Sequence, residues 1–123
     1  MTLREQVYLK FDGKCAYSGT KLKDDWQIDH IVPKYQNGSN HIDNLVPVQR
    51  ILNHYKRALD LEDFRTWLLG ELHLRLKKLP KNPRVERTIR HKEYLLEVAE
   101  LFGITVDKPF DQVFYFEKIK EQK

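Results

Sequence analysis

The sequence contains a single cysteine in 123 residues. One thiol cannot form an internal disulfide, which excludes the disulfide-stapled class of small secreted domains and fits a reducing interior. Long apolar runs are also missing. The longest is residues 113–116, far too short to span a bilayer, and residues 1–5 show no apolar signal region. We therefore expect a cytoplasmic protein that does not enter a membrane.

Glycine and proline are scarce as well, with five of each, and no repeat or linker is visible. This excludes collagen-like and low-complexity chains. Hydrophobic residues make up 41% and charged residues 33%, as in a folded globular protein. A chain of this length is large enough for one modest core, so we expect a single domain over residues 1–123.

Positive charge is concentrated in one stretch. The net charge is +4, but residues 73–92 hold eight Lys or Arg and only one acid, Glu86, which gives this stretch +7 and leaves −3 for the remainder. Such a stripe is typical of a protein that binds a polyanionic partner, and it is equally compatible with a helix face that is only solvated.

Hydrophobic spacing and turn residues predict the order of elements. Helices are expected over about 3–11, 49–59, 61–79 and from 83 to 102, and strands at 14–19, 26–32, 45–48 and 113–116. The last strand is expected to join the N-terminal strands. The predicted class is α+β, with a core over about 3–64 and a helical, basic extension over about 61–123.

An acidic residue and a histidine, Asp29 and His30, end the second predicted strand, just before Pro33 and a polar loop. A carboxylate can hold a hard cation, and an imidazole of near-neutral pKa can take a proton from water. Alone this dipeptide is weak evidence. Asn44, just before the third strand, and Asn53, on the following helix, add amide groups at defined points of a strand–loop–strand–helix order.

This order resembles the HNH endonuclease family, whose fold is the ββα-metal unit. The matching segments are residues 15–19 (CAYSG), 29–33 (DHIVP), 44–47 (NLVP) and 53–56 (NHYK). The resemblance implies that His30 is the general base, Asp29 a metal ligand and Asn44 the asparagine that fixes the loop and the imidazole. It implies that Asn53 is the helix-borne metal ligand, while a shift of one residue would give that place to His54.

Many members of the family carry two CxxC pairs that bind a structural zinc. The corresponding residues here are Cys15, Ser18, Gln49 and Leu52, which cannot form a tetrahedral zinc site. We therefore expect no structural zinc and a buried, inert Cys15, with packing in place of the metal.

The resemblance implies a metal-dependent endonuclease that hydrolyses DNA phosphodiesters, double-stranded DNA being the expected partner, with one Mg²⁺ or Mn²⁺. Alternatives are a non-catalytic nucleic-acid-binding module, or a nuclease subunit of a restriction, phage-defence or mobile-element system that needs a protein partner or a second copy. The basic side chains expected on nucleic acid are Lys34, Arg50, Lys56, Arg57, Arg84, Arg87 and Arg90.

Overall fold

The computed structural model describes residues 1–121 and confirms the α+β class. Its elements are helix α1 (Leu3–Leu9), strand β1 (Gln27–His30), 3₁₀ turns η1 (Lys34–Gln36) and η2 (Ile42–Asn44), strand β2 (Leu45–Val48), helices α2 (Arg50–Lys56) and α3 (Leu61–Asp63), the π-helical turn η3 (Phe64–Leu69), and helices α4 (Leu72–Lys77), α5 (Glu86–Phe102) and α6 (Tyr115–Glu121). Residues 122–123 of the predicted extension lie outside this range.

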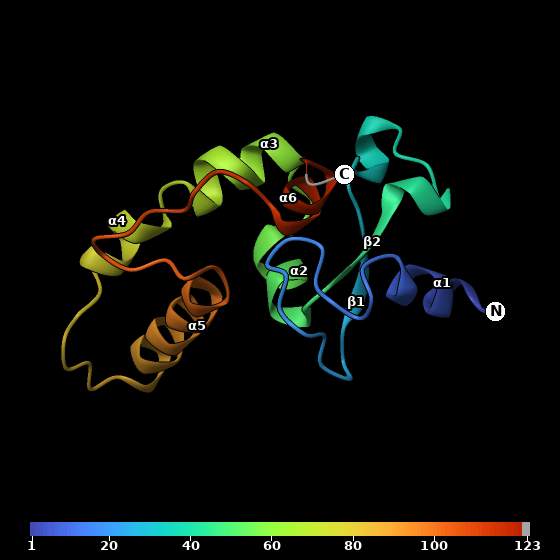
Figure 1. Ribbon diagram of the computed structural model, residues 1–123. Coiled ribbons are helices and arrows are strands. Elements are labelled where there is room, and N and C mark those ends of the chain that lie inside the picture. The colour runs from blue at the N-terminus through green and yellow to red at the C-terminus, as the bar shows by residue number, and fades with distance from the viewer. Residues whose placement is uncertain (122–123) are drawn as a thin grey trace.

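The centre of the fold is a two-stranded antiparallel sheet followed at once by α2 (Figure 1). Asp29 of β1 stands opposite Val46 of β2, and Ile28 stands opposite Pro47. The proline is tolerated because a strand with one sheet partner needs N–H groups on one side only. The four residues of β2 are fully buried, so this strand anchors the unit to the core.

The N-terminal helix braces the loop between the strands. Thr2 and Glu5 form a capping box that starts α1, as their spacing predicts. At the other end of the helix, the Lys10 ammonium donates to the carbonyls of Ile42 (2.8 Å) and Leu45 (2.6 Å). Burial lowers the pKa of Lys10, against the attraction of Asp43. The contact fixes η2 and the start of β2, where Asn44 lies.

The predicted C-terminal strand at 113–116 is wrong, because the chain forms helix α6 from Tyr115 onward. The predicted neighbour is nevertheless right. The N–H groups of Tyr115 and Phe116 donate to the carbonyls of Tyr17 (3.0 Å) and Ala16 (2.9 Å). These are first-turn donors that a helix cannot satisfy internally. Glu117 completes the helix start by accepting from the Phe114 N–H (2.9 Å).

Three further expectations are corrected. Residues 14–19 form a turn with one isolated bridge, Lys14 to Lys21, instead of a strand. The helix predicted over 61–79 is divided into α3, η3 and α4, and α5 begins at Glu86, not at 83. Local apolar spacing marked these helices but carried no signal for their interruptions.

Aromatic packing joins the central unit to the extension. The Tyr17 ring contacts Phe64 and Phe114 at centroid distances of 5.3 and 5.1 Å, and Phe64 stacks on Phe114. In Figure 1, α4, α5 and the loop between them lie on the side of the molecule away from α1. Within residues 1–121, no helix has the length and apolar character needed to cross a membrane.

Candidate functional site

A hollow of about 180 Å³ opens where β1 ends and α2 ends. It contains Asp29 and His30 together, although adjacent residues of a strand normally face opposite sides. The His30 carbonyl accepts from the Lys56 ammonium (3.4 Å), which is one contact of His30 with this hollow. The lining residues are Asp29, His30, Pro33, Lys34, Lys56, Arg57 and Ala58.

Asp29 is buried and held through one oxygen. Its Oδ2 accepts from the Tyr17 hydroxyl (2.7 Å) and lies 3.0 Å from the Lys56 ammonium, whose side chain is 1% exposed. Burial, and then the Asp29 charge, raise the pKa of Tyr17 well above its ordinary value. Tyr17 therefore remains a neutral donor that fixes this carboxylate. Among residues 1–121, no hydrogen bond reaches Oδ1 of Asp29.

The His30 imidazole is held from the loop. Its Nε2 lies 2.9 Å from Oδ1 of Asn40. Because an amide oxygen only accepts, Nε2 carries the hydrogen in this pair, and Nδ1 of the neutral ring keeps its lone pair. The arrangement leaves the imidazole with one nitrogen that can accept a proton.

Asn44 closes the loop that carries Asn40. Its side chain accepts from the Val32 N–H (2.8 Å) and donates to the carbonyls of Val32 (3.1 Å) and Ser39 (2.8 Å). Gly38 completes this closure, since a Cβ there would collide with the Val32 carbonyl oxygen. Asn44 thus contacts loop backbone, while the imidazole, which Asn44 was also predicted to fix, has Asn40 as its partner.

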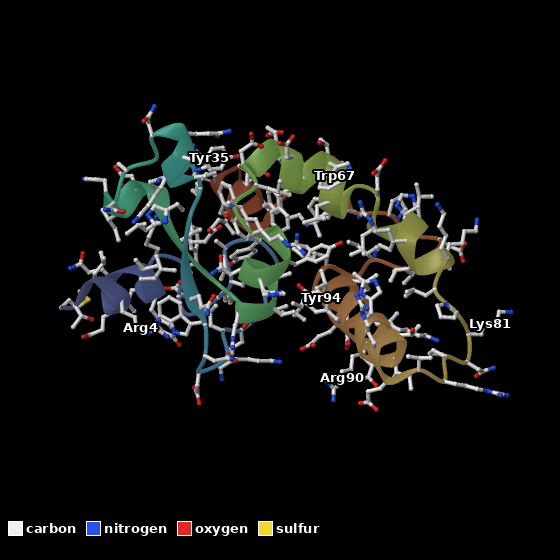
Figure 2. The ribbon with its side chains drawn as sticks, turned by 180° about the vertical axis from the view of Figure 1, so that it is seen from behind. Arg4, Tyr35, Trp67, Lys81, Arg90 and Tyr94 are labelled. Carbon is white, nitrogen blue, oxygen red and sulfur yellow. The ribbon has the colours of Figure 1, made fainter. Side chains whose placement is uncertain are left out.

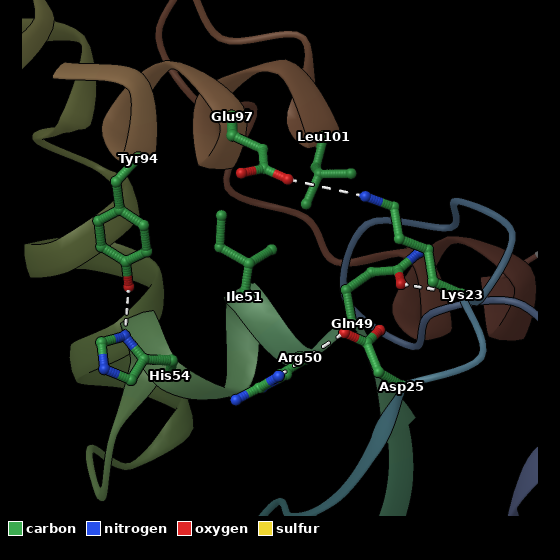
Figure 3. Close-up of a pocket in the computed structure, with 9 residues that line it drawn as sticks. All are labelled: Lys23, Asp25, Gln49, Arg50, Ile51, His54, Tyr94, Glu97 and Leu101. Carbon is green, nitrogen blue, oxygen red and sulfur yellow. Dashed lines mark hydrogen bonds and ion pairs between the residues drawn. The ribbon is translucent and has the colours of Figure 1, made fainter. Parts of the chain in front are cut away.

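Asn53 and His54 face different parts of the molecule. Asn53 Nδ2 donates to Gln27 of β1 (2.6 Å), two residues before Asp29 on the same strand face. His54 turns toward α5, and its Nδ1 lies 2.8 Å from the Tyr94 hydroxyl (Figure 3). Asn53 does not line the hollow.

Cys15, Ser18, Gln49 and Leu52, the four residues compared above with zinc-binding cysteines, make other contacts in this structure. Cys15 and Leu52 are fully buried in the core, and the Ser18 hydroxyl pairs with Thr20 (2.7 Å). The buried Gln49 amide accepts from the Lys23 N–H (3.2 Å) and donates to Thr20 Oγ1 (3.0 Å) and the Lys21 carbonyl (2.7 Å). One amide therefore ties the 20–23 segment to the start of α2.

Gln49 also forms part of the wall of a second cavity, of about 310 Å³, between α2 and α5 (Figure 3). Its charged side chains are matched in pairs, Lys23 with Glu97 (3.7 Å) and Arg50 with Asp25 (4.0 Å). The Lys23–Glu97 pair and the His54–Tyr94 contact fasten α5 to the central unit, whereas the Arg50–Asp25 pair joins α2 to the segment before β1.

The predicted nucleic-acid-binding side chains occupy different places. Lys34 and Arg57 are exposed at the hollow, whereas Arg50 lies at the opposite end of α2. Lys56 is buried against Asp29, which places its ammonium out of reach of an external phosphate. Figure 2 shows Arg90, on the exposed face of α5, at the edge of the molecule opposite Tyr35 of η1, so the basic stretch and the loop beside His30 lie apart.

Two residues of the site were missed by sequence reasoning. Tyr17 belongs to the CAYSG segment, but nothing in its spacing links a hydroxyl there to Asp29. Asn40 is one of several polar residues in the loop, and its contact depends on the closure made by Asn44. An aromatic hydroxyl twelve residues before a buried aspartate is the only signal that could have indicated the first.

Residues 13–50 match the family model of the HNH endonuclease. The match covers both strands of the sheet, His30 and Asn44, and it confirms the resemblance seen in the sequence over this segment. Family members are generally nucleases, typically with a divalent metal. Neither curated proteins nor solved structures gave a match.

The donors at the hollow can be tested against a divalent ion. Within residues 1–121, no group of three His, Cys, Asp or Glu side chains is suitably placed to hold a metal. Among residues 1–121 one oxygen of Asp29 has no hydrogen bond, and the side-chain oxygen of Asn53, which lies outside the lining of the hollow, is the second candidate donor. This set fits an ion bound weakly through oxygen, with most of its ligands supplied by water and phosphate.

Proposed function

We propose that the chain hydrolyses DNA phosphodiesters, with His30 as the general base. The observation that carries the proposal is the His30–Asn40 pair, in which His30 lines the hollow and Asn40 belongs to the loop between the strands. It directs one imidazole nitrogen into a hydrogen bond and leaves the other able to accept a proton from water. The HNH match over residues 13–50 supports the same chemistry.

The remaining residues of the site have supporting roles in this proposal. Asn44 closes the loop and so, through Asn40, sets the position of the imidazole. Asp29 and Asn53 would hold one Mg²⁺ or Mn²⁺. When bound, this ion supplies positive charge against the phosphate and the leaving oxygen. Tyr17 and Lys56 hold the Asp29 carboxylate in place.

Double-stranded DNA would contact Lys34 and Arg57 beside His30, and a longer duplex would reach Arg50 or the basic stretch with Arg84, Arg87 and Arg90. We include residues 1–123 in one endonuclease domain, whose core is about 3–64. A protein partner or a second copy in a restriction or mobile-element system would account for targeting.

One observation favours a second candidate, a nucleic-acid-binding module without turnover. Asp29, the carboxylate that lines the hollow, is already paired with the buried Lys56 ammonium at 3.0 Å. A divalent ion at Asp29 must therefore tolerate a neighbouring positive charge. In a binding module, this ion pair would be purely structural.

Incubation of the purified protein with supercoiled plasmid decides between the two. The proposal predicts nicked or linear DNA with Mg²⁺ or Mn²⁺, none with EDTA, and recovery when the metal is restored. Asn53→Ala should raise the metal concentration required, whereas His54→Ala, on the α5 side, should not. DNA binding without cleavage under every metal would instead establish the binding module.

A further inference from the structure

The end of α2 has a backbone conformation that is unfavourable for the residue found there. Arg57 follows the last residue of the helix with φ 56° and ψ −135°. These angles lie outside the left-handed well that Asn and Asp tolerate, in a region used almost only by glycine. Glycine adopts such angles without steric cost, because it has no Cβ to clash.

Two other helix caps follow the usual rule. The caps of η1 and α5 also have positive φ, and they are Asn37 and Gly103. Among residues 1–121, Arg57 and Gln112 are the only positive-φ residues other than Gly, Asn and Asp. Of these two, only Arg57 lines the hollow. The strain is therefore placed where the proposed chemistry occurs.

The Arg57 side chain is free to bind a ligand. It is exposed, and within residues 1–121 no hydrogen bond or ion pair engages its guanidinium. Lys56, the neighbouring cation, is committed to Asp29. Arg57 and Lys34 are thus the two side chains of the hollow that can offer positive charge to an incoming anion.

We infer that Arg57 is a catalytic residue whose guanidinium contacts the scissile phosphate. A planar guanidinium donates two parallel N–H bonds to the non-bridging oxygens, a geometry that lysine cannot reproduce. Positive charge placed where a phosphate gains charge in the transition state lowers the barrier more than it strengthens binding. This inference rests on the proposed function, and it assigns Lys34 to a neighbouring phosphate.

The strain makes the test sharp, because one substitution should separate stability from activity. Arg57→Gly removes the guanidinium, and it also removes the energetic cost of the backbone conformation, because glycine adopts these angles without a clash. We expect an unchanged or higher thermal midpoint, a dissociation constant for duplex DNA within about threefold of wild type, and a cleavage rate at saturating DNA at least about 10²-fold lower. Arg57→Lys should recover only part of that rate.

Gln112→Gly is the matched control. It relieves the other strained position, and its backbone carbonyl, which accepts from Arg65 (2.7 Å), is retained. It should raise the thermal midpoint and leave cleavage unchanged.

If the wild-type protein cleaves DNA, two results would overturn the role of Arg57 and leave the proposed function standing. One is an Arg57→Gly variant with more than about a third of the wild-type rate. The other is a lower thermal midpoint for that variant, which would give the side chain a structural role. Absence of cleavage by wild type under any divalent metal would overturn the proposed function and this inference together.

Discussion

Replacing Gln49 by alanine removes a side chain that bonds the 20–23 segment to the start of α2. The side chain is 3% exposed and makes three hydrogen bonds, to the Lys23 N–H, Thr20 Oγ1 and the Lys21 carbonyl. At a net value of about 1 kcal/mol each, their loss costs about 3 kcal/mol of the free energy of unfolding. For a domain of this size the thermal midpoint should fall by about 12 °C.

Thermal and urea unfolding of Gln49→Ala and wild type measure this loss. The same measurement in EDTA shows whether a bound metal, and not the Gln49 side chain, stabilises this part of the fold. Gln6→Ala is the control, because Gln6 lies exposed on α1 with a single bond to the Met1 carbonyl (3.2 Å). It should change stability by less than about 0.5 kcal/mol. Wild type should hold much less than one zinc per chain and keep its midpoint in EDTA.

A Gln49→Ala variant within about 0.5 kcal/mol of wild type would refute the idea that this amide supports the fold. Stoichiometric zinc that survives dialysis, or unfolding by chelation, would refute the expectation that Cys15 and its neighbours bind no metal.

The remaining predictions concern the loop, the basic stretch and the C-terminal helix. Asn40→Ala should lower the cleavage rate about tenfold or more with unchanged DNA affinity, because the His30 imidazole loses its hydrogen-bond partner. Hydrogen exchange should show that the loop closed by Asn44 keeps its protection in this variant. In the basic stretch, the substitutions Arg84→Glu, Arg87→Glu and Arg90→Glu should reduce the salt dependence of DNA binding. The slope of the logarithm of the binding constant against the logarithm of the salt concentration should fall by about 0.9 for each lost phosphate contact. An unchanged slope would show that the stretch is a solvated face. Arg65 lowers the pKa of Glu117, so this pair stabilises the fold above the ordinary glutamate pKa of about 4.3 and the benefit is lost as pH falls through the lower folded value. Glu117→Gln should therefore flatten the acid dependence of the unfolding free energy below about pH 5, and an unaltered acid limb would contradict the linkage.

Local signals predicted much of the central unit. Apolar alternation and the DHIVP and NLVP segments placed both strands, and the capping box of Thr2 and Glu5 placed α1. The predicted C-terminal strand was wrong. Residues 113–116 are β-branched or aromatic, which favours a strand, but Phe114 is fully buried just before a helix as well. What decided it was tertiary: carbonyls of residues 16–17 accept from the first N–H groups of α6, and Arg65 holds Glu117.

The site divides in the same way. Residue type and order indicated Asp29 and His30 as site residues, and both line one hollow in the structure. The Tyr17 and Asn40 contacts could not be predicted, because each joins segments whose approach depends on the completed fold. The burial of Lys56 was likewise invisible, since lysine on a short polar helix is ordinarily exposed.

The single-turnover rate of duplex DNA cleavage by His30→Ala tests the central claim most directly. His91→Ala is the control, because His91 is an exposed histidine on α5 outside the hollow. With Mg²⁺ or Mn²⁺, we expect His30→Ala to lose about 10²-fold or more of the rate while its thermal midpoint stays within a few degrees of wild type, and His91→Ala to cleave normally. A folded His30→Ala protein that keeps more than about a tenth of the wild-type rate would contradict the account.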